Sequence, residues 1–118
     1  MDYIIHNFDD LKGRVFSCIT ANEENIIFED NTGKIFILKH FQDCCESVYI
    51  ESIIGDLQDL INSPILMAEE SSNSNNIEEG SETWTFYKLA TIKGYVDIRF
   101  YGESTGYYSE TVDLIELI

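Results

Sequence analysis

Short apolar runs rich in β-branched and aromatic residues, separated by turn-forming residues, recur along most of this chain of 118 residues. They fall at residues 15–20, 25–29, 34–40, 65–69, 82–92, 95–101 and 108–118. Val, Ile, Thr, Tyr and Phe favour an extended backbone because their side chains pack well on a pleated surface. This pattern predicts a twisted, mainly antiparallel β-sheet.

Two of these runs carry further detail. The run at residues 34–40 is apolar on both faces, which predicts a central strand, and residues 30–33 form a turn before it. The runs at 82–92 and 95–101 predict a hairpin about Lys93 and Gly94. Alternation in the hairpin predicts inward and outward positions. Val96, Ile98 and Phe100 are expected to face the core, Tyr95, Asp97, Arg99 and Tyr101 to face outward, and Thr83, Thr85, Tyr87 and Thr91 to face outward on the partner strand. Trp84 is expected in the core.

One segment has helical rather than strand periodicity. Ser52 suits a helix N-cap, and the apolar residues that follow recur on one face up to residue 61. Residues 62–64 end this segment with Pro64, the only proline. A short helix is also expected near residues 7–12. The predicted fold class is therefore α+β: a mainly antiparallel twisted sheet with one principal helix at about residues 52–62.

The length suits a single domain spanning residues 1–118. Residues 69–81 are rich in Ser, Asn and Glu, which predicts a flexible polar loop at about 70–81 or a hairpin tip. The three cysteines, two of them adjacent, do not suit a disulfide framework and favour reduced thiols in a cytosol. No apolar run reaches the ~18 residues of a membrane span, and no basic region opens the chain. We therefore expect a cytoplasmic protein without membrane contact.

Acidic residues outnumber basic ones by 22 to 7, which gives a formal net charge of −15. No Lys or Arg occurs from His40 to Tyr87, whereas ten acids do, and the last nineteen residues also lack a base. Such a surface repels phosphate backbones and attracts basic proteins. The charge therefore argues against direct nucleic-acid binding and favours a basic protein partner, although solubility alone also explains an acidic composition.

Potential metal ligands are concentrated at residues 40–46, which read His-Phe-Gln-Asp-Cys-Cys-Glu. Zinc prefers thiolate and imidazole donors, with carboxylate as a harder alternative. One prediction is a structural zinc site formed by His40, Asp43, Cys44 and Cys45. The spacing is not that of a zinc finger, and neighbours on an extended chain point in opposite directions, so ligation requires a turn. Inert packing of the cysteines is the other interpretation.

The same cluster allows a catalytic alternative, a metal-dependent or thiol enzyme. A cysteine of the pair would be the nucleophile with His6 or His40 as base, or Glu46 would serve a catalytic zinc as general base. Cys18 is interpreted as buried packing that could also reach the cluster as a ligand. The sequence has no phosphate-binding loop, dinucleotide fingerprint or nucleophile elbow. The favoured interpretation is a protein that is not an enzyme.

Residues 40–48, read with 53–57, 63–66, 82–87 and 102–109, resemble a family of small proteins of unassigned function encoded largely by bacteriophages and mobile elements. The Gln-Asp-Cys-Cys-Glu core at residues 42–46 is the most specific part of this resemblance. The resemblance implies phage origin and a setting in the host bacterial cell. Small acidic phage proteins of this kind include inhibitors of defence nucleases, some similar to anti-CRISPR proteins against Cas9.

Charge and resemblance together predict an anti-CRISPR-like inhibitor that binds a basic, nucleic-acid-handling surface of a host defence protein, such as a Cas9-type nuclease. Exposed tyrosines are frequent interface anchors. The predicted partner-binding residues are acids and tyrosines: Glu69, Glu70, Glu78, Glu79, Tyr101, Glu103 and Tyr107. The protein is expected to act as a monomer or a small homo-oligomer.

Overall fold

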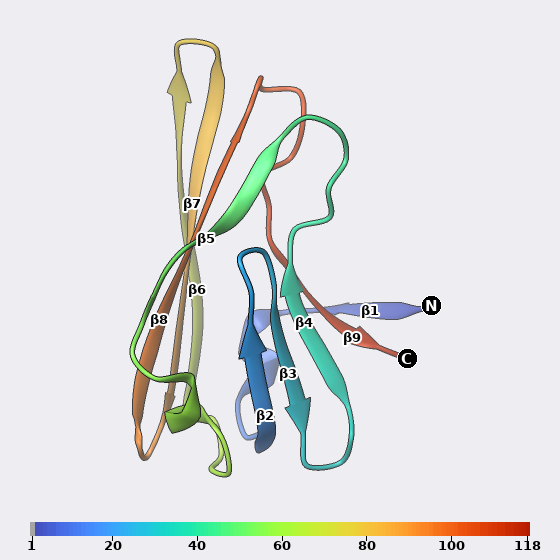
Figure 1. Cartoon of the computed structure of the whole chain (residues 1–118), viewed down its shortest axis with the longest axis vertical. Coiled ribbons are helices and arrows are strands. Elements are labelled where there is room, and N and C mark those ends of the chain that lie inside the picture. The colour runs from blue at the N-terminus through green and yellow to red at the C-terminus, as the bar shows by residue number, and fades with distance from the viewer. Residues whose placement is uncertain (1) are drawn as a thin grey trace.

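The computed structural model describes residues 2–118, which form two antiparallel β-sheets (Figure 1). The first sheet has five strands in the order β1 (Tyr3–His6), β9 (Asp113–Leu117), β4 (Ile35–Lys39), β3 (Ile26–Asp30) and β2 (Phe16–Ala21). The second has four, in the order β5 (Ser47–Ile54), β8 (Gly94–Ser104), β7 (Gly80–Thr91) and β6 (Met67–Ile77). Two 3-10 turns complete the described chain, η1 (Phe8–Leu11) and η2 (Leu57–Leu60).

The two sheets share one hydrophobic core. Phe16, Phe28 and Phe36 pack ring against ring in the first sheet, and all three are fully buried. Tyr87 of β7 is equally buried and contacts Phe8 of η1, with ring centroids 4.5 Å apart. A single cluster of buried apolar side chains therefore joins both sheets and η1.

Several predicted strands are confirmed, as is the central place of residues 34–40. Strand β4 lies between β3 and β9 in the first sheet. The turn before it is built around Asp30, whose Oδ1 accepts hydrogen bonds from the backbone N–H of Thr32 and Lys34 at 2.8 and 2.9 Å. Burial alone would raise the pKa of Asp30, but these hydrogen bonds and the charge of Arg14 outweigh burial and lower it. The ionised carboxylate thus fixes the β3–β4 turn.

The predicted principal helix at 52–62 is wrong, and so is the α+β class that depended on it. Residues 2–118 contain no α-helix, and the segment divides between the end of β5 and the single 3-10 turn η2. Asp56 caps that turn by accepting a hydrogen bond from Gln58 N, and Asn62, at φ 60°, follows it. Leu60 is fully buried, with Ile53, Leu57 and Ile61 packed against the core. The apolar spacing that suggested a helix is therefore satisfied by a strand end and one tight turn.

The segment at 70–81 is strand rather than a polar loop. Ser71 to Asn76 pair residue by residue with β7, and only Glu78 and Glu79 lie in the turn of a long hairpin. The alternative interpretation as a hairpin tip was closer to the structure. Polar composition misled because both faces of this strand are exposed, so no hydrophobic alternation marks it.

The inward face of β8 is as predicted, but the faces of β7 are reversed. Val96, Ile98 and Phe100 are buried, and they share their face with Thr85, Tyr87 and Thr91, which are buried too. Residues paired across strands share a face, and Trp84 pairs with Tyr101, so Trp84 lies on the outer side. None of the helical turns in the described chain has the length or apolar character needed to cross a bilayer.

Candidate functional site

Residues 40–46 form a closed loop between β4 and β5, here called the signature loop. Its centre is the buried carboxylate of Glu46. Glu46 Oε2 accepts the backbone N–H of Asp43 at 2.8 Å, and Oε1 accepts that of Cys44 at 2.9 Å. The side-chain amide of Gln42 donates to the Glu46 carbonyl at 2.6 Å and to the Cys44 carbonyl at 3.1 Å. The motif residues therefore satisfy the loop's own backbone.

Glu46 is held in its ionised form. The backbone N–H of Cys44 contributes most, and with the hydrogen bonds from Asp43 and His40 it overcomes desolvation and lowers the pKa of Glu46 from 4.5 to about 2. A carboxylate that accepts several hydrogen bonds is stabilised in its charged form because protonation would break them. The buried charge thus acts as an anchor for the loop.

His40 is the side-chain partner of Glu46. Its Nε2 lies 2.7 Å from Glu46 Oε2, and its Nδ1 lies 2.6 Å from the carbonyl oxygen of Thr111. Both partners only accept hydrogen bonds, so the ring satisfies both when both nitrogens carry a proton. His40 therefore links Glu46 to the carbonyl of Thr111 and ties the signature loop to the segment before β9.

This arrangement does not suit the predicted zinc ligands. Both ring nitrogens of His40 are occupied, and the sulfurs of Cys44 and Cys45 are joined to each other at the exposed tip of the loop. Within residues 2–118 no group of three or more His, Cys, Asp or Glu side chains is placed to hold a metal ion. Zinc binding stays a prediction that this geometry does not favour. Cys18, expected to be buried, is an exposed free thiol on β2.

The second predicted base, His6, is also fully engaged. Its Nδ1 lies 3.0 Å from Asp10 Oδ2, and its Nε2 lies 2.7 Å from Glu116 Oε1. As with His40, both partners are acceptors only. Neither ring therefore presents a free nitrogen toward a cysteine, and the thiol-enzyme alternative gains no support from the geometry.

A second buried carboxylate fastens the strand ends next to the signature loop. Glu110 accepts hydrogen bonds from Ser81 Oγ at 2.5 Å, from Thr83 Oγ1 at 2.8 Å and from the hydroxyl of Ser104. Burial opposes its ionisation, but these hydroxyl hydrogen bonds and the charge of His40 outweigh burial and lower the pKa of Glu110. Two ionised glutamates and one histidine therefore fix the end of the molecule where β7 begins and β8 ends.

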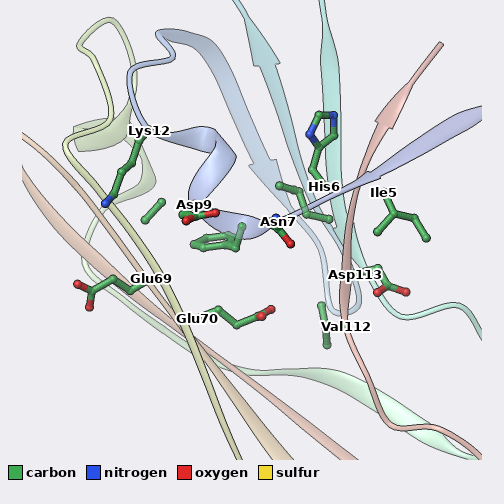
Figure 2. Close-up of a pocket in the computed structure, with 12 residues that line it drawn as sticks. Ile5, His6, Asn7, Asp9, Lys12, Glu69, Glu70, Val112 and Asp113 are labelled. Carbon is green, nitrogen blue, oxygen red and sulfur yellow. The ribbon is translucent and has the colours of Figure 1, made fainter.

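A cleft of about 740 Å³ opens between the two sheets. Figure 2 shows Glu70 of β6 and Asp113 of β9 on opposite sides of this opening, with Asn7 between them. Asp9 and Glu69 add further negative charge, against Lys12 as the one lysine of the lining. Tyr87 lies beneath it, and its hydroxyl donates to the carbonyl of Val112 at 3.5 Å. Burial and the neighbouring Glu70 raise the pKa of Tyr87, so its hydroxyl stays protonated.

The side of the second sheet that points away from the first, here called the outer face, carries a row of aromatic rings. Tyr49 pairs with Tyr101, and Tyr101 pairs with Trp84, across three neighbouring strands. The Tyr49 and Tyr101 rings are 5.8 Å apart, and the Tyr101 and Trp84 rings 5.2 Å. Tyr49 is 39% exposed, and the other two rings are half-buried. We call these three residues the aromatic row.

Two carboxylates lie along one side of the aromatic row. The Tyr101 hydroxyl donates to Glu82 Oε1 at 3.1 Å and lies 3.3 Å from Glu103 Oε2. Desolvation, followed by the hydrogen bond to Glu82, raises the pKa of Tyr101 to about 12. On the opposite side of the row, Arg99 is paired with Glu51 at 2.7 Å, so its charge is already neutralised. The free charge beside the row is therefore negative.

The predicted partner-binding residues fall in four places. Tyr101 and Glu103 lie on the outer face, as does Glu69, which also borders the cleft, and Glu78 and Glu79 form the β6–β7 turn. Tyr107 is 89% exposed in the β8–β9 connection, whereas Glu70 lines the cleft instead. Figure 1 shows the β4–β5, β6–β7 and β8–β9 connections gathered at the same end of the molecule. Glu78, Glu79, Glu82, Glu103 and Asp43 lie there, and we call this region the acidic end.

Sequence reasoning missed Tyr49 and Trp84 as surface residues. The exposure of Tyr49 was missed because β5 was not recognised as a strand. The exposure of Trp84 was missed because its face was assigned without considering which residue it pairs with on β8. Counting residues across the two-residue turn between Thr91 and Gly94 would have placed Trp84 beside Tyr101.

Comparison with known proteins identifies one family. The model for a domain of unknown function, DUF7448, matches residues 9–114, which include the signature loop, the aromatic row and most of the residues that line the cleft. No curated protein and no solved structure gives a match.

Proposed function

We propose, from the premise that this chain belongs to the DUF7448 family of domains of unknown function, that it is a non-catalytic protein that binds a basic protein surface through its outer face. The observation that carries the proposal is the aromatic row with Glu82 and Glu103 beside it. The chain as a whole carries a formal net charge of −15, so a basic partner is drawn toward the molecule from a distance.

The chemistry of the row suits an arginine-rich partner. A guanidinium group stacks on Trp or Tyr faces, with a gain of roughly 0.5–2 kcal/mol depending on how far it is desolvated. The same group pairs with carboxylates in a fork-like geometry that a lysine does not reproduce. Tyr101 joins the two features, since its ring belongs to the row and its hydroxyl orients Glu82.

The rings are held in place before a partner arrives. Tyr49, Tyr101 and Trp84 project from paired strands rather than from loops, and each ring packs on its neighbour. Side chains that are already ordered lose little entropy on binding. Aromatic residues in such positions are frequent centres of binding energy.

The resemblance to phage-encoded proteins indicates which partner to test first. A host nuclease of the Cas9 type has a positively charged channel for nucleic acid. The acidic end would occupy this channel in place of nucleic acid. In this form of the proposal the chain inhibits the nuclease by blocking nucleic-acid loading. Direct binding of nucleic acid is disfavoured by the same charge.

The test measures binding of the wild-type chain and its variants to a purified Cas9-type nuclease by surface plasmon resonance. We expect Trp84→Ala and Tyr101→Ala each to weaken binding at least about tenfold, equivalent to about 1.4 kcal/mol. Tyr95→Ala is the matched control, because Tyr95 is 72% exposed on the same face but distant in register from the acidic end. It should bind like the wild type.

Charge is tested with the double variant Glu82→Gln, Glu103→Gln. It should associate more slowly than the wild type and show a weaker dependence on salt. Glu23→Gln, Glu24→Gln in the β2–β3 turn removes the same charge elsewhere and should behave like the wild type. Absence of wild-type binding at low salt would overturn the nuclease as partner. Equal binding by the Trp84 and Tyr95 variants would overturn the assigned surface.

A further inference from the structure

Strand β6 is an edge strand with an unusually open side. The second sheet has the order β5-β8-β7-β6, so β6 pairs with β7 alone. It runs for 11 residues, and the stretch from Ser71 to Asn76 contains neither a charged residue nor a proline. Long edge strands without these features are rare because they pair readily with other chains.

The other three edges of the described sheets are protected. Strand β1 has only 4 residues. Strand β2 carries a bulge between Phe16 and Cys18, and its Phe16 carbonyl accepts the N–H of Asn62. Strand β5 carries a bulge between Ile50 and Ser52, and the N–H of Ile50 donates to the carbonyl of Glu23. Bulges and covering segments are the usual protection of sheet edges, so the openness of β6 is a local property.

The free backbone groups of β6 can be assigned. Ile77 pairs with Gly80 across a two-residue turn, and the closing pair of such a hairpin is hydrogen-bonded. Because hydrogen-bonded and non-hydrogen-bonded pairs alternate, Ser71, Asn73 and Asn75 bond to β7. Ser72, Ser74 and Asn76 therefore direct N–H and C=O away from it. In the described part of the chain no backbone group pairs with these positions from the open side.

Side-chain contacts agree with this assignment. Side chains approach most closely at non-hydrogen-bonded pairs. Ser74 is opposite Thr83 in the register, and their hydroxyl oxygens are 2.8 Å apart. The first part of β6 is not open in this way, because Ala68, Glu69 and Glu70 line the cleft. The open edge is thus the stretch from Ser71 to Ile77.

Charge decides between a second copy of the chain and a different partner. Glu69 and Glu70 precede the uncharged stretch, and Glu78 and Glu79 follow it. Antiparallel pairing of two copies about the middle of the stretch would place Glu69 and Glu70 of each copy beside Glu78 and Glu79 of the other. Like charges across strands are destabilising, whereas opposite charges stabilise.

We propose that the open edge of β6 accepts an extended segment of a partner protein as an additional strand, with an uncharged middle flanked by Lys or Arg. The partner's backbone would bond to Ser72, Ser74 and Asn76, and its basic ends would meet the two glutamate pairs. This mode of binding takes its affinity from main-chain hydrogen bonds and its selectivity from flanking side chains. The edge does not include the aromatic row, so the two proposals can fail independently.

The probe is a synthetic peptide of alternating threonine and valine with two lysines at each end. Binding is followed by residue-resolved amide hydrogen exchange of the whole chain. At saturating peptide, we expect exchange at Ser72, Ser74 and Asn76 to slow at least about tenfold, the size of effect that corresponds to a free-energy change of about 1.4 kcal/mol. The same peptide with glutamates at its ends should give no protection.

The decisive variant is Ser72→Pro, which removes one outward N–H while leaving the bonds of Ser71 and Asn73 to β7. Proline is tolerated at such positions of edge strands. It should abolish peptide binding, whereas the matched control Ser72→Ala keeps the N–H and should bind like the wild type. A peptide N-methylated at alternate backbone nitrogens makes the same test on the wild-type chain and should not bind.

Three outcomes would overturn the proposal. The first is equal peptide binding by Ser72→Pro and Ser72→Ala. The second is protection at β1, β2 or β5 instead of β6. The third is protection of Ser72, Ser74 and Asn76 that rises with protein concentration in the absence of peptide, which would mean that a second copy occupies the edge.

Discussion

At the scale of single residues, the signature loop shows how side chains of the metal-ligand type can stabilise the backbone of their own loop. Glu46 accepts two backbone N–H groups of its own loop and pairs with His40, which also reaches the carbonyl of Thr111. Glu46 and His40 meet other protein groups in the fold, and the two cysteine sulfurs meet each other. The cysteines lie at the exposed tip of the loop.

The role of Glu46 predicts a specific acid sensitivity. Its folded pKa is about 2 against an ordinary value of 4.5, so the unfolded chain takes up the proton first as pH falls. The stability that Glu46 contributes is therefore complete above about pH 4.5 and is lost progressively toward pH 2. The free energy of unfolding of Glu46→Gln, measured in urea, should fall less steeply over this window than that of the wild type.

Glu24→Gln is the control for this measurement, because Glu24 is exposed and accepts no hydrogen bond from the described chain. Its acid profile should follow that of the wild type. If Glu46→Gln and the wild type lose stability in parallel between pH 4.5 and pH 2, the anchoring role assigned to Glu46 is wrong.

At the scale of elements, Gly55 is the residue at which the chain leaves β5, within the segment that the sequence predicted as a helix. This residue follows β5 with φ of +107°, a conformation that L side chains rarely adopt. A Cβ atom at this position would lie 2.6 Å from the carbonyl oxygen of Tyr95. The chain therefore leaves β5 through a tight approach to β8 that only glycine permits.

Gly55→Ala should destabilise the protein by about 2–4 kcal/mol, because backbone strain and a steric clash with the main chain add. Gly13→Ala is the matched control, since Gly13 also has positive φ, of +84°, but has no atom within 4 Å of a new Cβ. It should cost only about 1–2 kcal/mol. Urea unfolding of both variants measures the difference, and equal losses would contradict the close approach of Gly55 to β8.

At the scale of the whole molecule, the high negative charge opposes the stability of the folded state. A formal net charge of −15 disfavours a compact state through self-repulsion. Screening by salt reduces this repulsion, since the Debye length falls to about 3 Å at 1 M. The melting temperature should therefore rise with sodium chloride.

A less negative variant makes this prediction specific. Glu23→Lys, Glu24→Lys reverses two exposed charges in the β2–β3 turn and should raise the melting temperature at low salt. Its further increase with salt should be smaller than that of the wild type. A melting temperature of the wild type that does not change with salt would mean that self-repulsion contributes little to its stability.

The sequence by itself determined the strands whose side chains alternate or are apolar on both faces. The inward face of β8 follows from local pattern because burial on one side imposes a period of two, and β4 follows because its run is apolar on both faces. The turn at Asp30 follows from its own short-range hydrogen bonds. The net charge and the absence of Lys and Arg from residue 40 to residue 87 are likewise properties of the sequence alone.

Only the tertiary structure decided the rest. Strand β6 has no buried face of its own, and its extended form depends on hydrogen bonds to β7. The partners of His40 and His6 lie 71 and 110 residues away, at Thr111 and Glu116, so no local pattern could reveal that both rings are occupied. The aromatic row joins three strands separated in sequence. Hydrogen bonds and ring contacts between distant segments are fixed by the register of the sheets, which the chain establishes only when it folds.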